Sequence, residues 1–173
     1  MEKLEKQKCP ICHKDSLSLI ELAKEVPYFG IVHIFSMDCS ECNYHMADVE
    51  AAEEKEPARY TLEINSEKDM NIRIVKSSTA LVKIPELKMS VEPGMASNGY
   101  VTNVEGILER FKKILENERD TTEDDDVKKK SKNLLKKIWK IKLGEMPVKI
   151  ILEDKSGNSA IISEKAKVEK IKK

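Results

Sequence analysis

The middle of the chain alternates apolar and polar residues with a period of two, which predicts β-strands. Tyr60, Leu62 and Ile64 share one face of a first strand, and Ile72 and Ile74 share one face of a second. The alternation continues through a further set of positions: residues 80–84, Leu87, Met89 and Val91. A Pro-Gly pair at residues 93–94 and an Asn-Gly pair at residues 98–99 follow as turn signals. We therefore expect a β-rich block in this part of the chain.

The spacing then changes to that of amphipathic helices. Apolar residues recur every three or four positions in two stretches: Val104, Ile107, Leu108, Phe111 and Leu115, and then Leu134, Leu135, Ile138 and Ile141. Thr102 followed by Glu105 predicts a capping box at the start of the first helix. We expect the acidic residues 116–126 to form a charged loop between the helices. The pattern predicts an antiparallel helical hairpin over about 102–143.

Strand periodicity resumes in residues 148–162, with turn residues at 156–158. Strands before and after an inserted helical pair imply that the last strands rejoin the first sheet. Two charged segments lack a clear period. We expect residues 47–58 to be a linker or a short solvated helix, and residues 164–173 to be a frayed C-terminal tail.

The positive and negative charges of the chain are equal in number, which bears on the kinds of partner that it can bind. Lys+Arg and Asp+Glu both total 31, so the formal net charge is zero. A general electrostatic attraction to nucleic acid or to an anionic membrane is therefore not favoured. Apolar runs fall far below the roughly 18 residues that cross a bilayer, and the first ten residues lack the apolar segment of a secretory signal. We expect a soluble, cytoplasmic protein.

All four cysteines lie in the first quarter of the chain, as two CxxC pairs: Cys9 with Cys12, and Cys39 with Cys42. Two intervening residues let a tight turn direct both thiolates to one point, and a second such turn completes a tetrahedron around zinc. Four thiolates leave no open coordination position, so the predicted site is structural. The spacing alone also allows iron, and it leaves room for redox-active or unligated cysteines. We expect His13 and His45, which follow the pairs, to be surface residues.

The segment between the cysteine pairs predicts a zinc ribbon. Two apolar stretches flank the turn at residues 27–30, and the second is rich in β-branched and aromatic residues. Two strands joined by this turn, with a cysteine pair at each end, bury so little that the metal should supply much of the folding free energy. Tyr28 and Phe29 lie at the turn. Either they cap the ribbon against the next domain or they form an exposed contact for a partner.

Residues 127–142 hold eight lysines and Trp139, the only tryptophan. One hypothesis is a basic amphipathic helix that binds nucleic acid or an acidic partner. The other is the solvated face of a helix whose Leu and Ile side chains pack on the core. The zero net charge and the neighbouring acids favour the solvated face. We expect Trp139 at the edge of the buried stripe.

Several segments together resemble the ZPR family of zinc-finger proteins, in order from about Cys9 to Ser159. They are CPIC, VPYFG, FSMDCSEC, VKSSTALVKIPELKMSVEPG, TNVEGILERF and IILEDKSGNS. The knuckle spacing is common to many ribbons, whereas the segments around residues 76–80 and 84–87 are far more specific. Asn43 stands where family members often have glycine. The chain holds one copy of the ribbon-plus-domain unit and is similar to the single-unit archaeal form.

The resemblance implies a mainly β fold with some α structure. It places an N-terminal four-cysteine zinc ribbon at residues 1–48. A double-stranded β-helix, a jelly-roll-like domain, then occupies residues 49–173, with the helical hairpin inserted at about 102–143. This arrangement agrees with the order of strands, hairpin and strands that the periodicity predicts.

The resemblance also implies a function, because eukaryotic members of the family bind translation elongation factor one-alpha and assist its folding. The implied role is a zinc-containing protein-interaction module. Its candidate contact residues are Tyr28 and Phe29 on the ribbon, and Lys76, Ser77 and Glu86 on the β domain. For the last three, turn and strand-end chemistry is the competing explanation.

Two further function classes compete with this one. The first is a nucleic-acid-binding ribbon of the translation or transcription machinery, although the cysteine pairs lack an interleaved basic and aromatic stripe. The second, an enzyme, is not expected. Metal-dependent oxygenases with this kind of fold need two histidines and a carboxylate facing inward, and all three histidines lie in the ribbon. A phosphate-binding glycine loop is also missing from the sequence.

Overall fold

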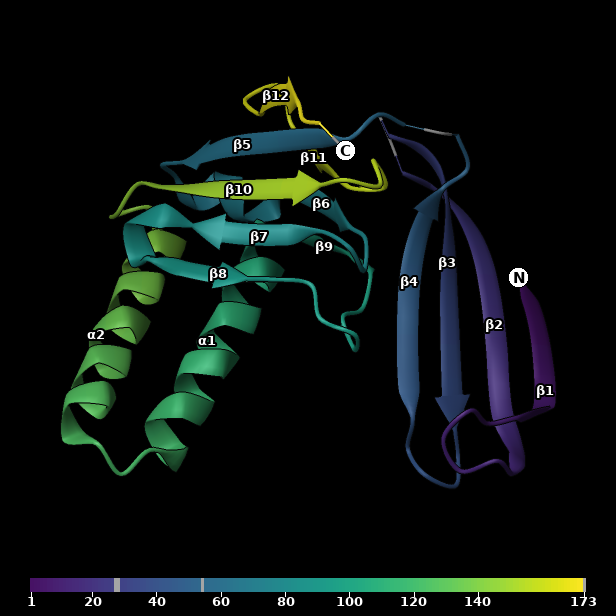
Figure 1. Cartoon of the computed structure of the whole chain (residues 1–173). Helices are drawn as coiled ribbons and strands as arrows, with labels where there is room; N and C mark the ends of the chain where they lie inside the picture. The colour runs from purple at the N-terminus through teal and green to yellow at the C-terminus, as the bar shows by residue number, and fades with distance from the viewer. Residues whose placement is uncertain (27–28, 54, 173) are drawn as a thin grey trace.

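The N-terminal part is a four-stranded antiparallel sheet, the ribbon (Figure 1). The computed structural model describes residues 1–26, 29–53 and 55–172. The ribbon strands pair in chain order: β1 (Glu2–Lys8), β2 (Asp15–Val26), β3 (Gly30–Cys39) and β4 (His45–Ala51). The two strands predicted between the cysteine pairs are β2 and β3, which pair from Leu17 with Cys39 to Val26 with Gly30.

The expectation of a linker or helix from residue 47 is wrong for residues 47–51. They belong to β4, which pairs with β3 from Asp38 opposite His45 to Val32 opposite Ala51. The physical reason is burial, because Val49 in the centre of β4 is completely shielded from solvent. Polar neighbours on either side of Val49 hide this single inward position in the sequence.

The second part, the β domain, contains two sheets (Figure 1). The larger sheet has the strand order β12-β5-β10-β7-β8, and the smaller has the order β11-β6-β9. Its strands are β5 (Ala58–Ile64), β6 (Arg73–Lys76), β7 (Leu81–Ile84), β8 (Met89–Val91), β9 (Tyr100–Asn103), β10 (Val148–Asp154), β11 (Ala160–Ile162) and β12 (Lys167–Lys170). Two short 3-10 helices are η1 (Glu67–Asn71) and η2 (Pro85–Leu87). Because β10 lies between β5 and β7, the late strands rejoin the early ones, as predicted.

The expected frayed C-terminal tail contains an ordered strand. Residues 167–170 form β12, which pairs with β5 from Lys167 opposite Thr61 to Lys170 opposite Ala58. Arg59 on β5 reaches Glu169 at 3.6 Å. Backbone pairing with the free edge of β5 orders this segment although every residue of β12 is exposed.

The helical hairpin consists of α1 (Val104–Thr121) and α2 (Asp125–Lys142). The helices begin and end differently from the prediction. The predicted capping box of Thr102 and Glu105 is wrong, because Asn103 caps α1: its side-chain oxygen accepts from the backbone N–H of Gly106 at 2.8 Å. The acidic residues 116–126 are mostly helical, and only residues 122–124 connect the two helices.

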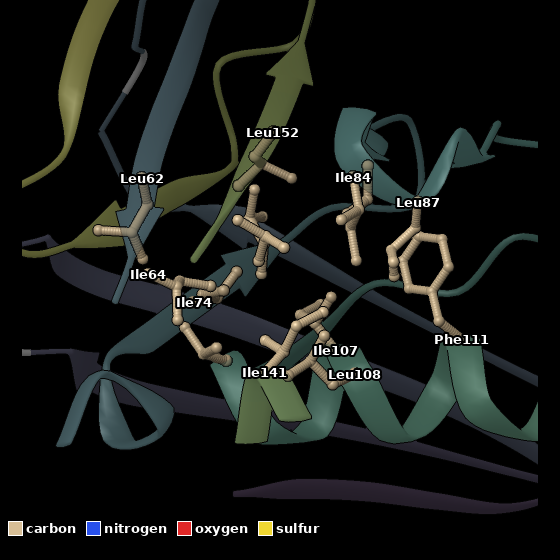
Figure 2. Packing of buried hydrophobic residues seen from close by; sticks show 14 of the residues in the cluster. Leu62, Ile64, Ile74, Ile84, Leu87, Ile107, Leu108, Phe111, Ile141 and Leu152 are labelled. Atoms are coloured by element: carbon tan, nitrogen blue, oxygen red, sulfur yellow. The ribbon is translucent and has the colours of Figure 1, made fainter. Parts of the chain in front are cut away.

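The main core lies between the larger sheet and the hairpin. Figure 2 shows Ile107, Leu108 and Phe111 of α1 and Ile141 of α2 pointing toward the strands. All four are at most 2% exposed, as are Leu62 and Leu152 on the facing strands. Burying each such side chain contributes about 1.5–3 kcal/mol. The core thus explains the two helical stripes read from the sequence.

The opposite side of α2 faces solvent. Ile138 and Ile141 are buried, whereas Trp139 is 67% exposed. The lysines of α2 are exposed, apart from Lys128 and Lys142, which are half-buried. The lysines therefore lie on the solvated face, as expected. Trp139 also lies on this face, and not at the edge of the buried stripe as its position beside Ile138 suggests.

Candidate metal centre

The two cysteine pairs form turns with the same backbone pattern. The N–H of Cys9 donates to the carbonyl of Lys14 at 2.9 Å, and the N–H of His13 donates back to Cys9 at 3.0 Å. Cys39 makes the equivalent bonds with Tyr44 and Asn43, at 2.9 and 3.1 Å. His13 and Asn43 both have left-handed backbones, with φ of 60° and 56°. This conformation favours glycine and tolerates Asn and His, which explains why Asn43 and His13 fit at these turns.

The turns bring the four sulfur atoms of Cys9, Cys12, Cys39 and Cys42 within 4.8 Å of one another. The Sγ atoms of Cys9 and Cys42 lie 3.7 Å apart, as do those of Cys12 and Cys39. Zinc holds thiolate sulfur at about 2.3 Å, so a tetrahedron of sulfurs around it has edges of about 3.8 Å. The cluster fits this geometry, and the four cysteines are positioned to bind a zinc ion. The ion would cross-link the β1–β2 and β3–β4 connections.

The histidines lie outside the sulfur cluster. His45 Nδ1 lies 2.7 Å from Asp38, and His33 Nδ1 lies 2.9 Å from Glu21. His13 is exposed at its turn. Because four thiolates complete the coordination of zinc, the metal centre has a structural role and offers no position for a substrate.

Cys39 accepts a hydrogen bond from a side chain outside the cysteine cluster. The Ser16 hydroxyl lies 3.2 Å from its Sγ. This bond, together with the backbone N–H groups of Cys42 and Glu41, lowers the pKa of the Cys39 thiol to about 6. These hydrogen bonds therefore favour the thiolate form of Cys39, which is the form that binds a metal ion.

Of the two aromatic residues predicted at the ribbon turn, Phe29 is 6% exposed and packs between the ribbon and the β domain. It forms one apolar cluster with residues of both parts: Val26, Val32 and Val49 of the ribbon, and Val75 and Ala160 of the β domain. Phe29 thus occupies the position of a cap and not that of an exposed contact. Tyr28 lies outside the described residues.

Lys76 and Ser77 are also buried, each 2% exposed. Lys76 Nζ donates to the backbone oxygen of Ser77 at 2.9 Å, and to the Ser97 hydroxyl and the Asn98 carbonyl at 3.4 Å. Burial lowers the pKa of Lys76, although the carboxylates of Asp154 and Asp48 oppose the change. These contacts give Lys76 a structural role within the β domain.

Ser77 belongs to a buried hydrogen-bonded network. Its hydroxyl donates to Asp154 at 2.8 Å, and its backbone N–H donates to the Ser159 hydroxyl at 2.9 Å. Glu86 lies elsewhere, on η2, where its carboxylate accepts from the backbone N–H of Lys149 at 3.0 Å. The structure therefore brings Lys76 and Ser77 together, apart from Glu86.

The sequence reasoning missed the residues that join the ribbon to the β domain. Asp48 on β4 accepts from the backbone N–H of Ser78 at 2.9 Å and from its hydroxyl at 2.6 Å. Asn98 and Asn158 accept from the backbone N–H groups of Ala47 and Ala51, at 2.9 and 3.2 Å. We call these contacts, with the apolar cluster around Phe29, the junction.

Gly99 shows how closely the two parts approach at the junction. Its N–H donates to the carbonyl of Ala47 at 2.9 Å. A Cβ atom at Gly99 would lie 2.5 Å from a carboxylate oxygen of Asp48 and 2.6 Å from the backbone nitrogen of Val49. Only glycine fits there without a shift. The sequence held one sign of the junction, which is the family-specific segment at residues 76–80 that contains Ser78. The sequence alone could not reveal that this segment contacts the ribbon.

Comparison with known proteins decides the family. Residues 1–57 match the ZPR1 zinc-finger domain, and residues 68–173 match the ZPR1 jelly-roll domain. The chain belongs to the ZPR1 family. The zinc ribbon and the jelly-roll fold predicted from the sequence are thereby confirmed.

Relatives of the ZPR1 family span archaea and eukaryotes. Uncharacterized ZPR1-like proteins of Methanocaldococcus jannaschii and Pyrococcus horikoshii are each 40% identical, over 95% of this chain and 83% and 76% of their own lengths. The zinc finger chaperone zpr1 of Schizosaccharomyces pombe is 29% identical over 88% of this chain, which covers 33% of that protein. In the part of the chain that the structure describes, no helix is long and apolar enough to cross a membrane.

Proposed function

We propose that this chain is a cytoplasmic, zinc-containing protein-interaction module that binds translation elongation factor one-alpha and assists its folding. Support comes from the match of both its parts to the ZPR1 family and from the S. pombe relative, which is named a zinc finger chaperone. The four-thiolate metal centre agrees with a role in holding a binding surface, since it has no open coordination position.

The observation that carries the proposal is the distribution of exposed apolar side chains. On the ribbon, Leu4 and Ile31 are 58% and 52% exposed. On the hairpin, Trp139 and Leu143 are 67% and 46% exposed. Exposed aromatic and aliphatic groups are the usual anchors of protein interfaces. The junction packs the ribbon against the β domain, so the exposed groups of both parts keep fixed positions relative to one another and can contact one partner together.

A catalytic role fits the chain poorly. All three histidines belong to the ribbon, and the β domain has none. The two-histidine, one-carboxylate site that this kind of fold uses for oxygen chemistry therefore cannot form inside the β domain. The partner in this proposal is a protein and not a small-molecule substrate.

The direct test is calorimetric binding of the zinc-loaded chain to purified elongation factor one-alpha from the same organism. Two variants each remove one exposed anchor, Ile31→Lys on the ribbon and Trp139→Ala on the hairpin. Glu63→Gln is the control, because Glu63 is a polar residue exposed on β5 of the β domain. We expect at least one of the two variants to weaken binding by about tenfold or more, which corresponds to about 1.4 kcal/mol, and the control to bind as wild type does.

Nucleic-acid binding is the competing function, and one observation favours it. Six lysines of α2 take part in no ion pair with the described residues: Lys129, Lys130, Lys132, Lys136, Lys137 and Lys140. On the ribbon, by contrast, Lys14 pairs with Glu41 and His33 with Glu21. If the chain binds RNA with an affinity that falls steeply with salt and shows no affinity for the elongation factor, the proposed function is overturned in favour of this one.

A further inference from the structure

A zinc ion bound by four thiolates carries two surplus negative charges, because the four sulfurs contribute four and the metal cancels two. Groups that donate hydrogen bonds to the sulfurs disperse this charge and fix the ligands in place, and such partners commonly change metal affinity about 10–100-fold. The residues that donate to the cysteines are therefore part of the metal centre, although they do not touch the metal.

Ser16 is the side chain that makes such a contact in this ribbon. It lies near the start of β2, and its hydroxyl oxygen is 3.2 Å from the Sγ of Cys39. A zinc-bound thiolate has no proton, so the hydroxyl must be the donor. The same residue accepts, through its backbone oxygen, from the N–H of Ser40 at 3.2 Å. Ser16 thus follows the first cysteine pair and contacts the second.

A second pair of side chains also connects the two cysteine turns, but it interacts more weakly because it is exposed to solvent. Lys14 and Glu41 form an ion pair whose side chains are 64% and 46% exposed. Exposed pairs of this kind contribute little, because water and salt screen them. The contact of Ser16 is partly buried beside the sulfurs, where a hydrogen bond to a charged acceptor is stronger.

We propose that Ser16 is a positioning residue of the metal centre. Its hydroxyl donates a hydrogen bond to the Cys39 thiolate. This bond orients the ligand, disperses its charge, and sets the affinity and the release rate of zinc. The proposal concerns the metal alone and does not depend on which partner the chain binds.

The test compares two substitutions of the same shape in the full chain. Ser16→Thr keeps a hydroxyl, whereas Ser16→Val replaces it with a methyl group. Zinc affinity and release are measured by competition with a chromogenic chelator. Ser18→Ala is the control, since the Ser18 hydroxyl makes no hydrogen bond with the described residues although it lies on the same strand. We expect Ser16→Val to bind zinc about 10–100-fold more weakly, and Ser16→Thr and Ser18→Ala to stay close to wild type.

Cobalt gives a second readout that a purely structural role would not change. Cobalt(II) replaces zinc in thiolate sites, and its sulfur-to-metal charge-transfer band reports the electron density on the sulfurs. Loss of the hydroxyl donor should shift this band to lower energy in Ser16→Val but not in Ser16→Thr. An unshifted band with wild-type zinc affinity in Ser16→Val would overturn the proposal, as would equal losses in Ser16→Val and Ser16→Thr without a shift.

Discussion

Asp154 is the buried carboxylate around which two of the most specific sequence segments are organised. It is 1% exposed and accepts from the hydroxyls of Ser159 at 2.6 Å, Ser77 at 2.8 Å and Thr79 at 2.9 Å. The hydroxyl and the backbone N–H of Ser156 donate to it as well, at 2.7 and 2.9 Å. Burial alone would raise the pKa of Asp154, but these hydrogen bonds, that of Ser159 first, outweigh burial and lower it.

The lowered pKa gives a pH-dependent prediction for Asp154→Asn. A carboxyl group whose pKa is lower in the folded state stabilises the fold above its unfolded pKa of about 3.9, and this stabilisation is lost as the pH falls through the folded value. We expect Asp154→Asn to lower the free energy of unfolding by about 2 kcal/mol or more at pH 7, because the charged hydrogen bonds disappear.

Denaturant titration at several pH values between 7 and 3 checks this expectation. The difference between wild type and Asp154→Asn should shrink toward the acid end. Glu63→Gln is the control, since Glu63 is exposed on the neighbouring strand β5. A difference that stays constant down to pH 3 would contradict the role given to the Asp154 charge.

At the scale of the element, the start of α1 depends on a single side chain. Asn103 accepts from the N–H of Gly106 and so satisfies one of the free donors at the helix start. We expect Asn103→Ala to cost about 1 kcal/mol in the free energy of unfolding. Thr102→Val keeps the shape of Thr102 and should cost less than about 0.5 kcal/mol. Thermal or denaturant unfolding measures both. A larger loss in Thr102→Val would restore Thr102 as the cap.

The strands that the sequence did not reveal lie at sheet edges or at the junction. β1 and β12 are edge strands whose residues are almost all exposed. Charged residues at such edges prevent pairing with other chains, so these strands carry no apolar alternation. β4 has only Val49 fully buried. The period-two pattern arises from burial on one face of a sheet, and a strand without such a face gives no pattern to read.

At the scale of the whole molecule, the junction joins the ribbon and the β domain into one packed unit. The ribbon contributes Phe29, Val32 and Val49 to the shared apolar cluster, and Asp48 supplies the hydrogen bonds to Ser78. In Figure 1, β4 is the ribbon strand on the side of the β domain. The ribbon is therefore stabilised from two ends, by the metal at the cysteine turns and by the apolar cluster at the opposite end.

Phe29→Ala tests the junction. Removing a buried phenylalanine side chain leaves a cavity, so we expect the free energy of unfolding to fall by about 3 kcal/mol or more. Hydrogen exchange of the β4 amides should accelerate as well. Ile31→Ala is the control, because Ile31 is close in sequence but 52% exposed, and it should cost less than about 1 kcal/mol. Equal and small losses in both variants would instead favour Phe29 as a partner contact.

The sequence by itself determined the parts whose signal is local. The spacing within each cysteine pair predicts the turn that directs two thiolates to one metal, and the periods of two and of three to four predict the strands and the hairpin. The specific segments identified the family. These features need only neighbouring residues to be read, which is why the metal centre, the inner strands and the two helices were predicted correctly.

Only the tertiary structure decided where Phe29, Lys76 and Ser77 lie and which residues form the junction. Asp48 meets Ser78 across 30 positions of sequence, and Ser77 meets Asp154 across 77. A polar residue gives no local sign that distant partners will bury it, because its burial becomes favourable only when those partners supply its hydrogen bonds. The same physics orders β12, whose backbone groups pair with β5 more than a hundred positions earlier in the chain.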